Sequence, residues 1–230
     1  MKKLLDGLSL FQRIAYPRHR ELFERLANNQ SPSVAFLACA DSRVVPNLLL
    51  QAEPGDLFIV RNAGNIVPPA GQAGEGVAAS IEYAVEALGI RDVIVCGHSN
   101  CGAMQGVLHP ERVAGLPSVA AWVRHAETAA AAVSDLYPDA DDETRLELVV
   151  EHNVIAQVRN LLTHDFIRRR VERQEVELYG WVYDIRTGAV RGLDASGRSF
   201  VPLGVEAKGS PDERALLASL ENDEDFWGKL

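Results

Sequence analysis

The chain has 230 residues, of which 47% are hydrophobic and 24% are charged, and this is the composition of an ordinary globular protein. A chain of this length fits one α/β domain and can bury a core without disulfides. The formal net charge of −9 argues against a nucleic-acid-binding surface and against a basic patch for membranes. We therefore expect neither a nucleic-acid partner nor a membrane partner.

The chain has three cysteines, an odd number, which indicates thiols kept in a reducing compartment and hence a cytoplasmic location. Residues 1–5 begin like a signal peptide, but Asp6 and Arg13 interrupt any apolar segment. The longest strongly apolar stretch, 34–40, is far shorter than the ~18 residues that a membrane span needs.

From its start, the chain shows helical spacing of apolar residues over 3–28, which predicts a helical arm over 1–30. The pair Tyr16-Pro17 predicts a kink in this arm, because proline lacks a backbone N–H. Three short apolar runs bounded by polar or turn residues then predict buried strands: 34–38, 57–60 and 93–96.

Helical periodicity predicts three longer helices between and after these strands: 75–88, 118–134 and 142–162. Residues 176–185 predict a fourth strand, and Thr187-Gly188 predicts a turn into a return strand near 189–193. This alternation predicts an α/β fold with a mainly parallel central sheet and flanking helices, in one domain over 1–230. Residues 205–230 carry seven acidic and three basic residues and are expected to form an acidic tail with a short helix.

Two cysteines and a histidine fall where parallel sheets usually place functional sites, just beyond the carboxyl ends of strands. Cys39 ends the first predicted strand, and His98 and Cys101 follow the third. Two sulfurs and one imidazole nitrogen suit Zn²⁺, and three protein ligands leave its fourth position open, as in catalytic zinc sites.

The alternative is that these thiols are only core residues, because free cysteine is among the most buried residue types. Asp41 and Arg43 favour a site, since charged residues at a buried strand end are costly unless they serve one. Cys96 lies inside an apolar run and is expected to be a core thiol, although it could share a strand face with His98.

Two motifs of the chain occur together in one known family: Cys39-Ala-Asp41-Ser-Arg43 and His98-Ser-Asn-Cys101-Gly102. With them the chain resembles the β-class carbonic anhydrases, most closely the plant-type branch and the bacterial enzymes associated with cyanate degradation. The similarity covers roughly 30–203 and includes four further stretches: 53–58, 61–65, 81–84 and 180–184.

The resemblance implies a β-carbonic anhydrase fold and zinc-dependent, reversible hydration of carbon dioxide to bicarbonate and a proton, by attack of hydroxide that zinc supplies. It implies one Zn²⁺ per chain, and it assigns the metal ligands to Cys39, His98 and Cys101. Asp41 and Arg43 match the catalytic carboxylate–guanidinium pair of the family.

The resemblance also implies a set of substrate-binding residues that lie partly across two subunits: Gln30, Phe58, Tyr83 and Gly102. Because related enzymes use the N-terminal arm to embrace a partner, we expect a homodimer or a higher even oligomer. A bicarbonate-gated branch of the family has tryptophan and glycine where this chain has Phe36 and Ala38, so we expect an ungated site.

Three other functions are compatible with parts of the pattern. Some relatives hydrolyse carbon disulfide or carbonyl sulfide on the same fold. A non-catalytic module that binds zinc or bicarbonate would have a closed site with four protein ligands. A cysteine hydrolase using Cys39, His98 and Asp41 would leave Cys101 idle and would tolerate a chelator.

Overall fold

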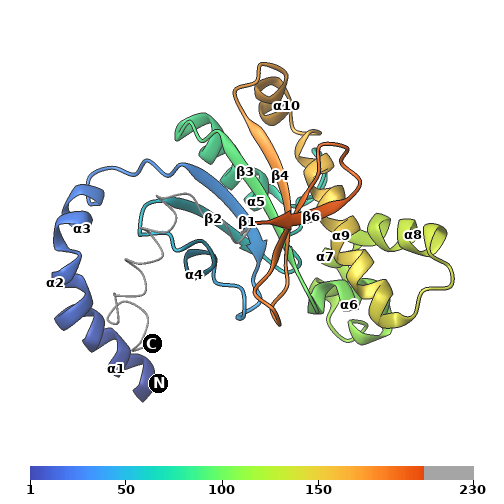
Figure 1. Ribbon diagram of the computed structural model, residues 1–230, viewed down its shortest axis with the longest axis horizontal. Coiled ribbons are helices and arrows are strands. Elements are labelled where there is room, and N and C mark those ends of the chain that lie inside the picture. Colours follow the sequence, from blue (N-terminus) through green and yellow to red (C-terminus); the bar gives the residue numbers. More distant parts are fainter. Residues whose placement is uncertain (205–230) are drawn as a thin grey trace.

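The computed structural model describes residues 1–204, and its centre is a six-stranded sheet in the order β2-β1-β3-β4-β5-β6 (Figure 1). Its strands are β1 (Val34–Cys39), β2 (Leu57–Asn62), β3 (Asp92–His98), β4 (Glu177–Tyr183), β5 (Val190–Leu193) and β6 (Phe200–Leu203). The first four strands in this order are parallel, and β5 and β6 continue the sheet in antiparallel pairing. The predicted mainly parallel α/β fold is confirmed.

The register brings the carboxyl ends of the central strands to one edge of the sheet. Cys39 at the end of β1 pairs with Asn62 at the end of β2, and His98 at the end of β3 pairs with Tyr183. The loops that follow Cys39, Asn62 and His98 therefore begin side by side.

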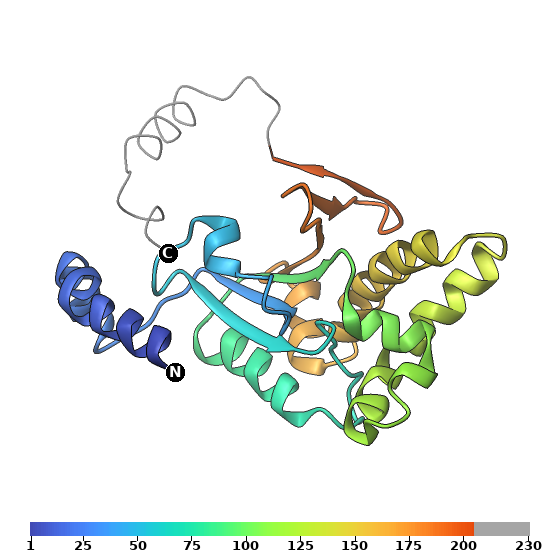
Figure 2. The ribbon, with the colours of Figure 1, turned by 90° about the horizontal axis from the view of Figure 1, so that it is seen from below.

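The helices described within residues 1–204, apart from the arm, have these bounds: α4 (Pro46–Leu50), α5 (Glu75–Glu82), α6 (Gly102–Leu108), α7 (Pro117–Val123), α8 (Glu127–Leu136), α9 (Asp142–Leu161) and α10 (Asp165–Glu172). Figure 2 shows α5 on one side of the sheet and α4 on the other. The larger core lies on the side that packs against α5 and α9, and a smaller cluster containing Phe36 and Cys96 lies on the opposite side. Because side chains alternate along β1, Leu37 faces the first cluster while Phe36 faces the second.

The N-terminal arm extends away from the sheet (Figure 1) and consists of α1 (Lys2–Leu10), α2 (Tyr16–Arg18) and α3 (Arg20–Leu26). None of the residues in these helices is buried. The predicted kink appears as a π-helical turn over Phe11–Ala15 and a break at His19, on either side of the proline. Among residues 1–204, the arm thus has an apolar surface that remains exposed.

The segment predicted as one helix over 118–134 is instead divided, because a 3₁₀ turn at Arg124–Ala126 separates α7 from α8. Val123, Ala126 and Ala129 are all buried at intervals of three residues, and a 3₁₀ turn places such residues on one face. The helix over 75–88 likewise ends in a π-helical turn, Tyr83–Ala87.

The sequence did not lead us to expect α4, α6, α10 or β6. The predicted acidic tail, 205–230, lies outside the described residues. Among the helices of residues 1–204, none is both long enough and apolar enough to cross a membrane.

Candidate metal centre

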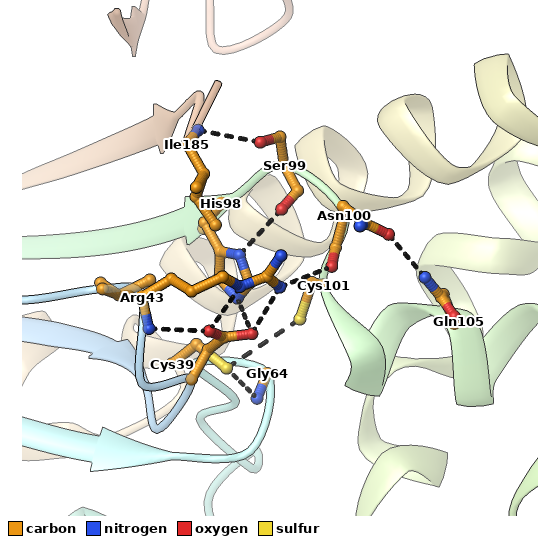
Figure 3. Close-up of polar contacts among 12 residues, drawn as sticks. Cys39, Arg43, Gly64, His98, Ser99, Asn100, Cys101, Gln105 and Ile185 are labelled. Atoms are coloured by element: carbon orange, nitrogen blue, oxygen red, sulfur yellow. Dashed lines mark hydrogen bonds and ion pairs between the residues drawn. The ribbon is translucent and has the colours of Figure 1, made fainter. Parts of the chain in front are cut away.

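The residues expected to bind zinc converge at the carboxyl edge of the sheet (Figure 3). Cys39 ends β1, His98 ends β3, and Cys101 directly precedes α6. One ligand atom from each lies within 4.8 Å of the others, and all three residues are buried. The two sulfurs are 4.0 Å apart, close to the ~3.8 Å expected for two Zn–S bonds of about 2.3 Å at a tetrahedral angle.

His98 has the tautomer that a metal ligand needs. Its Nδ1 lies 2.9 Å from the carbonyl oxygen of Ser99, and a carbonyl only accepts, so Nδ1 carries the proton. Nε2 is then an unprotonated nitrogen with a lone pair. Within the described part of the chain Nε2 is buried without a hydrogen-bond partner, a costly arrangement that a bound cation relieves.

The contact between the two cysteine sulfurs favours a thiolate at Cys39 and a thiol at Cys101. Hydrogen bonding with the Cys101 thiol lowers the pKa of Cys39 well below its ordinary value, and a backbone N–H from Gly64, 3.3 Å from Sγ, acts in the same direction. The same contact between the two sulfurs, together with burial, raises the pKa of Cys101. A divalent metal would replace that proton and hold both residues as thiolates.

Cys96 differs from the other two cysteines. It lies in the smaller cluster on the opposite side of the sheet, and its thiol donates to the carbonyl oxygen of Gly97 at 3.4 Å. Burial raises the pKa of Cys96 to about 12. The expectation of a core thiol at this position is confirmed.

Asp41 and Arg43 form a bidentate ion pair beside the three ligands. Arg43 Nε donates to Asp41 Oδ1 at 2.9 Å, Nη2 donates to Oδ2 at 2.7 Å, and the backbone N–H of Arg43 donates to Oδ1 at 3.0 Å. These bonds hold the pKa of Asp41 well below its usual range. Asp41 Oδ2 lies 3.9 Å from Nε2 of His98, so the carboxylate borders the position that a metal would take.

Two residues without an assigned role in the sequence hold this edge together. Arg61 donates to the backbone carbonyls of Cys39, Asp41 and Val44, and so fixes the loop after β1. Asn100, with φ of 53°, presents its own carbonyl to Arg43 Nη2 at 3.1 Å. An arginine directly after a buried run was the available signal for the first; no local pattern indicates the second.

The predicted substrate-binding residues are not all gathered by one chain. Gly102 lies beside the centre as the exposed first residue of α6. Phe58 and Tyr83 lie together, with ring centroids 6.1 Å apart, but Phe58 is four residues, or ~13 Å, before the end of β2. Gln30 is exposed ahead of β1, whose length of ~17 Å separates it from Cys39.

Comparison with known proteins identifies the family. A family model described as "Carbonic anhydrase" matches residues 34–190. A carbonic anhydrase of Pseudomonas aeruginosa is 50% identical, over 88% of this chain and 92% of the relative. Carbonic anhydrase 1 of Escherichia coli O157:H7 is 46% identical, with the same two coverages.

Solved structures agree with the sequence relatives. The β-carbonic anhydrase CcaA matches with a TM-score of 0.86 and 43% identity, over 88% of this chain and 99% of that one. A structure described as one of two tetrameric β-carbonic anhydrases from Sordaria macrospora matches with a TM-score of 0.76 and 28% identity, over 84% and 96%. The chain belongs to the carbonic anhydrase family, and within it to the β-class. The predicted family, fold and zinc cofactor are confirmed.

Proposed function

We propose that this protein catalyses the reversible hydration of carbon dioxide to bicarbonate and a proton, with one Zn²⁺ per chain held by Cys39, His98 and Cys101. The observation that carries the proposal is the unpaired, buried Nε2 of His98, which converges with two cysteine sulfurs beside an arginine-bound carboxylate. When bound, Zn²⁺ supplies Lewis acidity that makes hydroxide available near neutral pH.

Asp41 orients the attacking oxygen by accepting its hydrogen bond at Oδ2. The lowered pKa of Asp41 keeps the carboxylate ionised, so that it accepts and does not donate. Arg43 holds the carboxylate in one orientation through two parallel N–H···O bonds, which a lysine would not reproduce. The space beside Gly102 is open, since a Cβ built there would meet no atom within 4 Å.

The carbon dioxide pocket is completed by a second subunit, in a homodimer or a higher even oligomer. Support comes from the separation of Gln30 and Phe58 from the metal centre of their own chain, and from the contact of Tyr83 with Phe58. Tyr83 is 49% exposed although it contacts an aromatic partner, as expected of a pocket wall contributed to another subunit. A cytoplasmic location suits the chain, because two thiols 4.0 Å apart need reducing conditions to remain free for metal.

Metal analysis combined with stopped-flow carbon dioxide hydration tests the proposal. We expect about one zinc per chain, loss of hydration on treatment with a chelator, and recovery on adding Zn²⁺. Full hydration activity in the metal-free protein would refute the proposal. It would favour the hypothesis of a cysteine hydrolase, which needs no metal.

Carbon disulfide and carbonyl sulfide should be assayed on the same preparation. Turnover of either without carbon dioxide hydration would assign the alternative substrate class. One bound zinc with turnover of none of the three substrates would indicate a binding module.

A further inference from the structure

Helix α9 carries buried amide side chains for which the proposed reaction has no use. Asn153 is 1% exposed and Gln157 is 0% exposed, and they lie one helical turn apart. A buried amide costs free energy unless its donors and acceptors are paired, so the partners of these two residues indicate what the arrangement does.

A series of hydrogen bonds begins and ends in the loop after β2 and passes through both amides of α9. The backbone N–H of Val67 donates to Gln157 Oε1 at 2.9 Å, which fixes the orientation of that amide. Gln157 Nε2 therefore donates to Asn153 Oδ1 at 2.8 Å, and Asn153 Nδ2 donates to the carbonyl oxygen of Gly64 at 3.0 Å. The chain of donors ends on the residue that faces the metal centre.

Gly64 is held closely on its other sides too. Its φ of 83° is in the left-handed region, and a Cβ there would lie 2.9 Å from Cβ of Ala103 and 3.0 Å from Cε of Met104. The carbonyl of Ala63 belongs to the same peptide unit as the Gly64 N–H, and it accepts a bond from Trp122 Nε1 at 2.8 Å. With both flanking carbonyls held, the N–H of Gly64 is directed at Cys39 Sγ, 3.3 Å away (Figure 3).

Helix α9 is also a firm support, because it packs directly under the strand that carries the histidine. A Cβ on Gly97 would lie 2.8 Å from Val154 Cγ2 and 3.3 Å from Val150 Cγ1, so the helix and β3 are in close contact. One helix thus fixes the strand that ends at His98 and the loop that faces Cys39.

We infer that Asn153 is a positioning residue that holds the Gly64 amide on the Cys39 sulfur and thereby tunes how strongly this thiolate donates to the metal. The inference rests on Cys39 being a ligand, as proposed above. A hydrogen bond to a metal-bound thiolate withdraws charge from sulfur, and such outer contacts affect metal affinity by about 10–100-fold.

Cobalt is the probe for this effect, because Co²⁺ bound to thiolate gives a sulfur-to-metal charge-transfer band in the near ultraviolet. In Asn153→Leu, which keeps the shape but not the amide, we expect the band to move to lower energy. We also expect the zinc affinity, measured by competition with a chelator, to be ~10–100-fold lower than that of the parent protein.

Asn160→Leu is the matched control. Asn160 lies on the same helix and donates to the carbonyl of Val67 and to Gln157 Oε1, but not to Gly64. Both variants should lower the melting temperature, whereas only Asn153→Leu should move the band. An unmoved band in Asn153→Leu, with a loss of stability like that of the control, would show that Asn153 is merely structural.

A measurement on the parent protein keeps the inference testable if Asn153→Leu does not fold. In ¹⁵N-labelled protein loaded with ¹¹³Cd, the Gly64 amide should show scalar coupling to the metal through the N–H···S bond, and its absence would overturn the inference. A parent protein whose cobalt form lacks any thiolate band would instead overturn the ligand assignment.

Discussion

Asp41 is the residue through which the ion pair and the metal centre meet. Arg43 donates three hydrogen bonds to the carboxylate of Asp41. These bonds keep the carboxylate ionised and fix its orientation. Asp41→Asn should therefore retain zinc, since no ligand is lost, and should lower kcat/KM by ~10²-fold or more because the attacking oxygen is no longer oriented. Zinc content and stopped-flow kinetics on one preparation test this, and an Asp41→Asn protein with parent activity would contradict it.

Arg43→Ala tests the other half of the pair. Without the arginine, Asp41 loses its fixed orientation and is free to turn toward the metal, whose position it already borders. We expect zinc to be retained and kcat/KM to fall as far as in Asp41→Asn. Thermal unfolding should be measured first, because breaking a partly buried ion pair destabilises a protein. Greater activity in this variant than in Asp41→Asn would show that Arg43 does not act through the carboxylate.

The ligand assignment separates two cysteines that are five residues apart. Cys101→Ala should lose both zinc and hydration activity, whereas Cys96→Ala should retain zinc and lose only packing free energy. The physical reason is that Cys96 lies on the opposite side of the sheet, with its pKa raised to about 12 by burial. Metal analysis of the two purified variants decides, and zinc depletion in Cys96→Ala alone would reverse the assignment.

At the scale of single residues, the sequence predicted those functional residues that lie in short motifs. The spacing of Cys39, His98 and Cys101 was enough to predict a metal centre, because parallel strands end at one edge. The contacts of Arg61 and Asn153 were not predictable, since their partners lie 22 and 89 residues away and no local pattern links them. Buried hydrogen bonds of this kind depend on the completed fold.

The element that positions His98 is the pair formed by β3 and α9. Glycines on the sheet let the helix approach, and Gly97 and Gly180 each place a missing Cβ 2.8 Å from Val154. Gly97→Ala should cost ~1–3 kcal/mol of unfolding free energy through overpacking. It should also weaken zinc binding, because the displaced strand carries the adjacent ligand.

Val154→Ala should partly relieve this clash, so the double variant should be more stable than the sum of the two single effects. Denaturant unfolding of the four proteins gives the coupling free energy, expected at ~0.5–3 kcal/mol. Additive effects would show that Gly97 is not required for the approach of α9.

The division of the segment 118–134 shows where periodicity fails at the scale of elements. Alanine is favourable in any helix, so the composition gave no local reason to stop. The break coincides with burial at Val123, Ala126 and Ala129, which lie three residues apart, and a 3₁₀ turn places residues at this spacing on one face. A short strand such as β6 was missed for a similar reason, because its pairing with β5 decides its existence.

At the scale of the whole molecule, two features of residues 1–204 point to a second subunit. The expected pocket residues do not surround the metal centre, and the apolar residues of the arm are exposed. Leu4 is 69% exposed and Leu8 is 51% exposed on α1, although apolar residues repeated one turn apart usually pack against another surface. Gln30, Phe58 and Tyr83 are likewise distant from the metal centre of their own chain. A second copy would cover the arm and would bring one subunit's pocket residues to the other's metal.

The double variant Leu4→Ser, Leu8→Ser tests this assembly. We expect sedimentation to show dissociation toward the monomer, because two apolar contacts of the arm are lost from each subunit. Zinc should remain near one per chain, since its three ligands come from a single chain, whereas kcat/KM should fall at least tenfold because the pocket is incomplete.

Leu136→Ser is the control: Leu136 is 62% exposed on α8, away from the arm, and its substitution should change neither assembly nor activity. A monomeric double variant with the kcat/KM of the parent protein would show that each chain forms its pocket alone. Phe58 and Tyr83 would then have to move toward the metal of their own subunit.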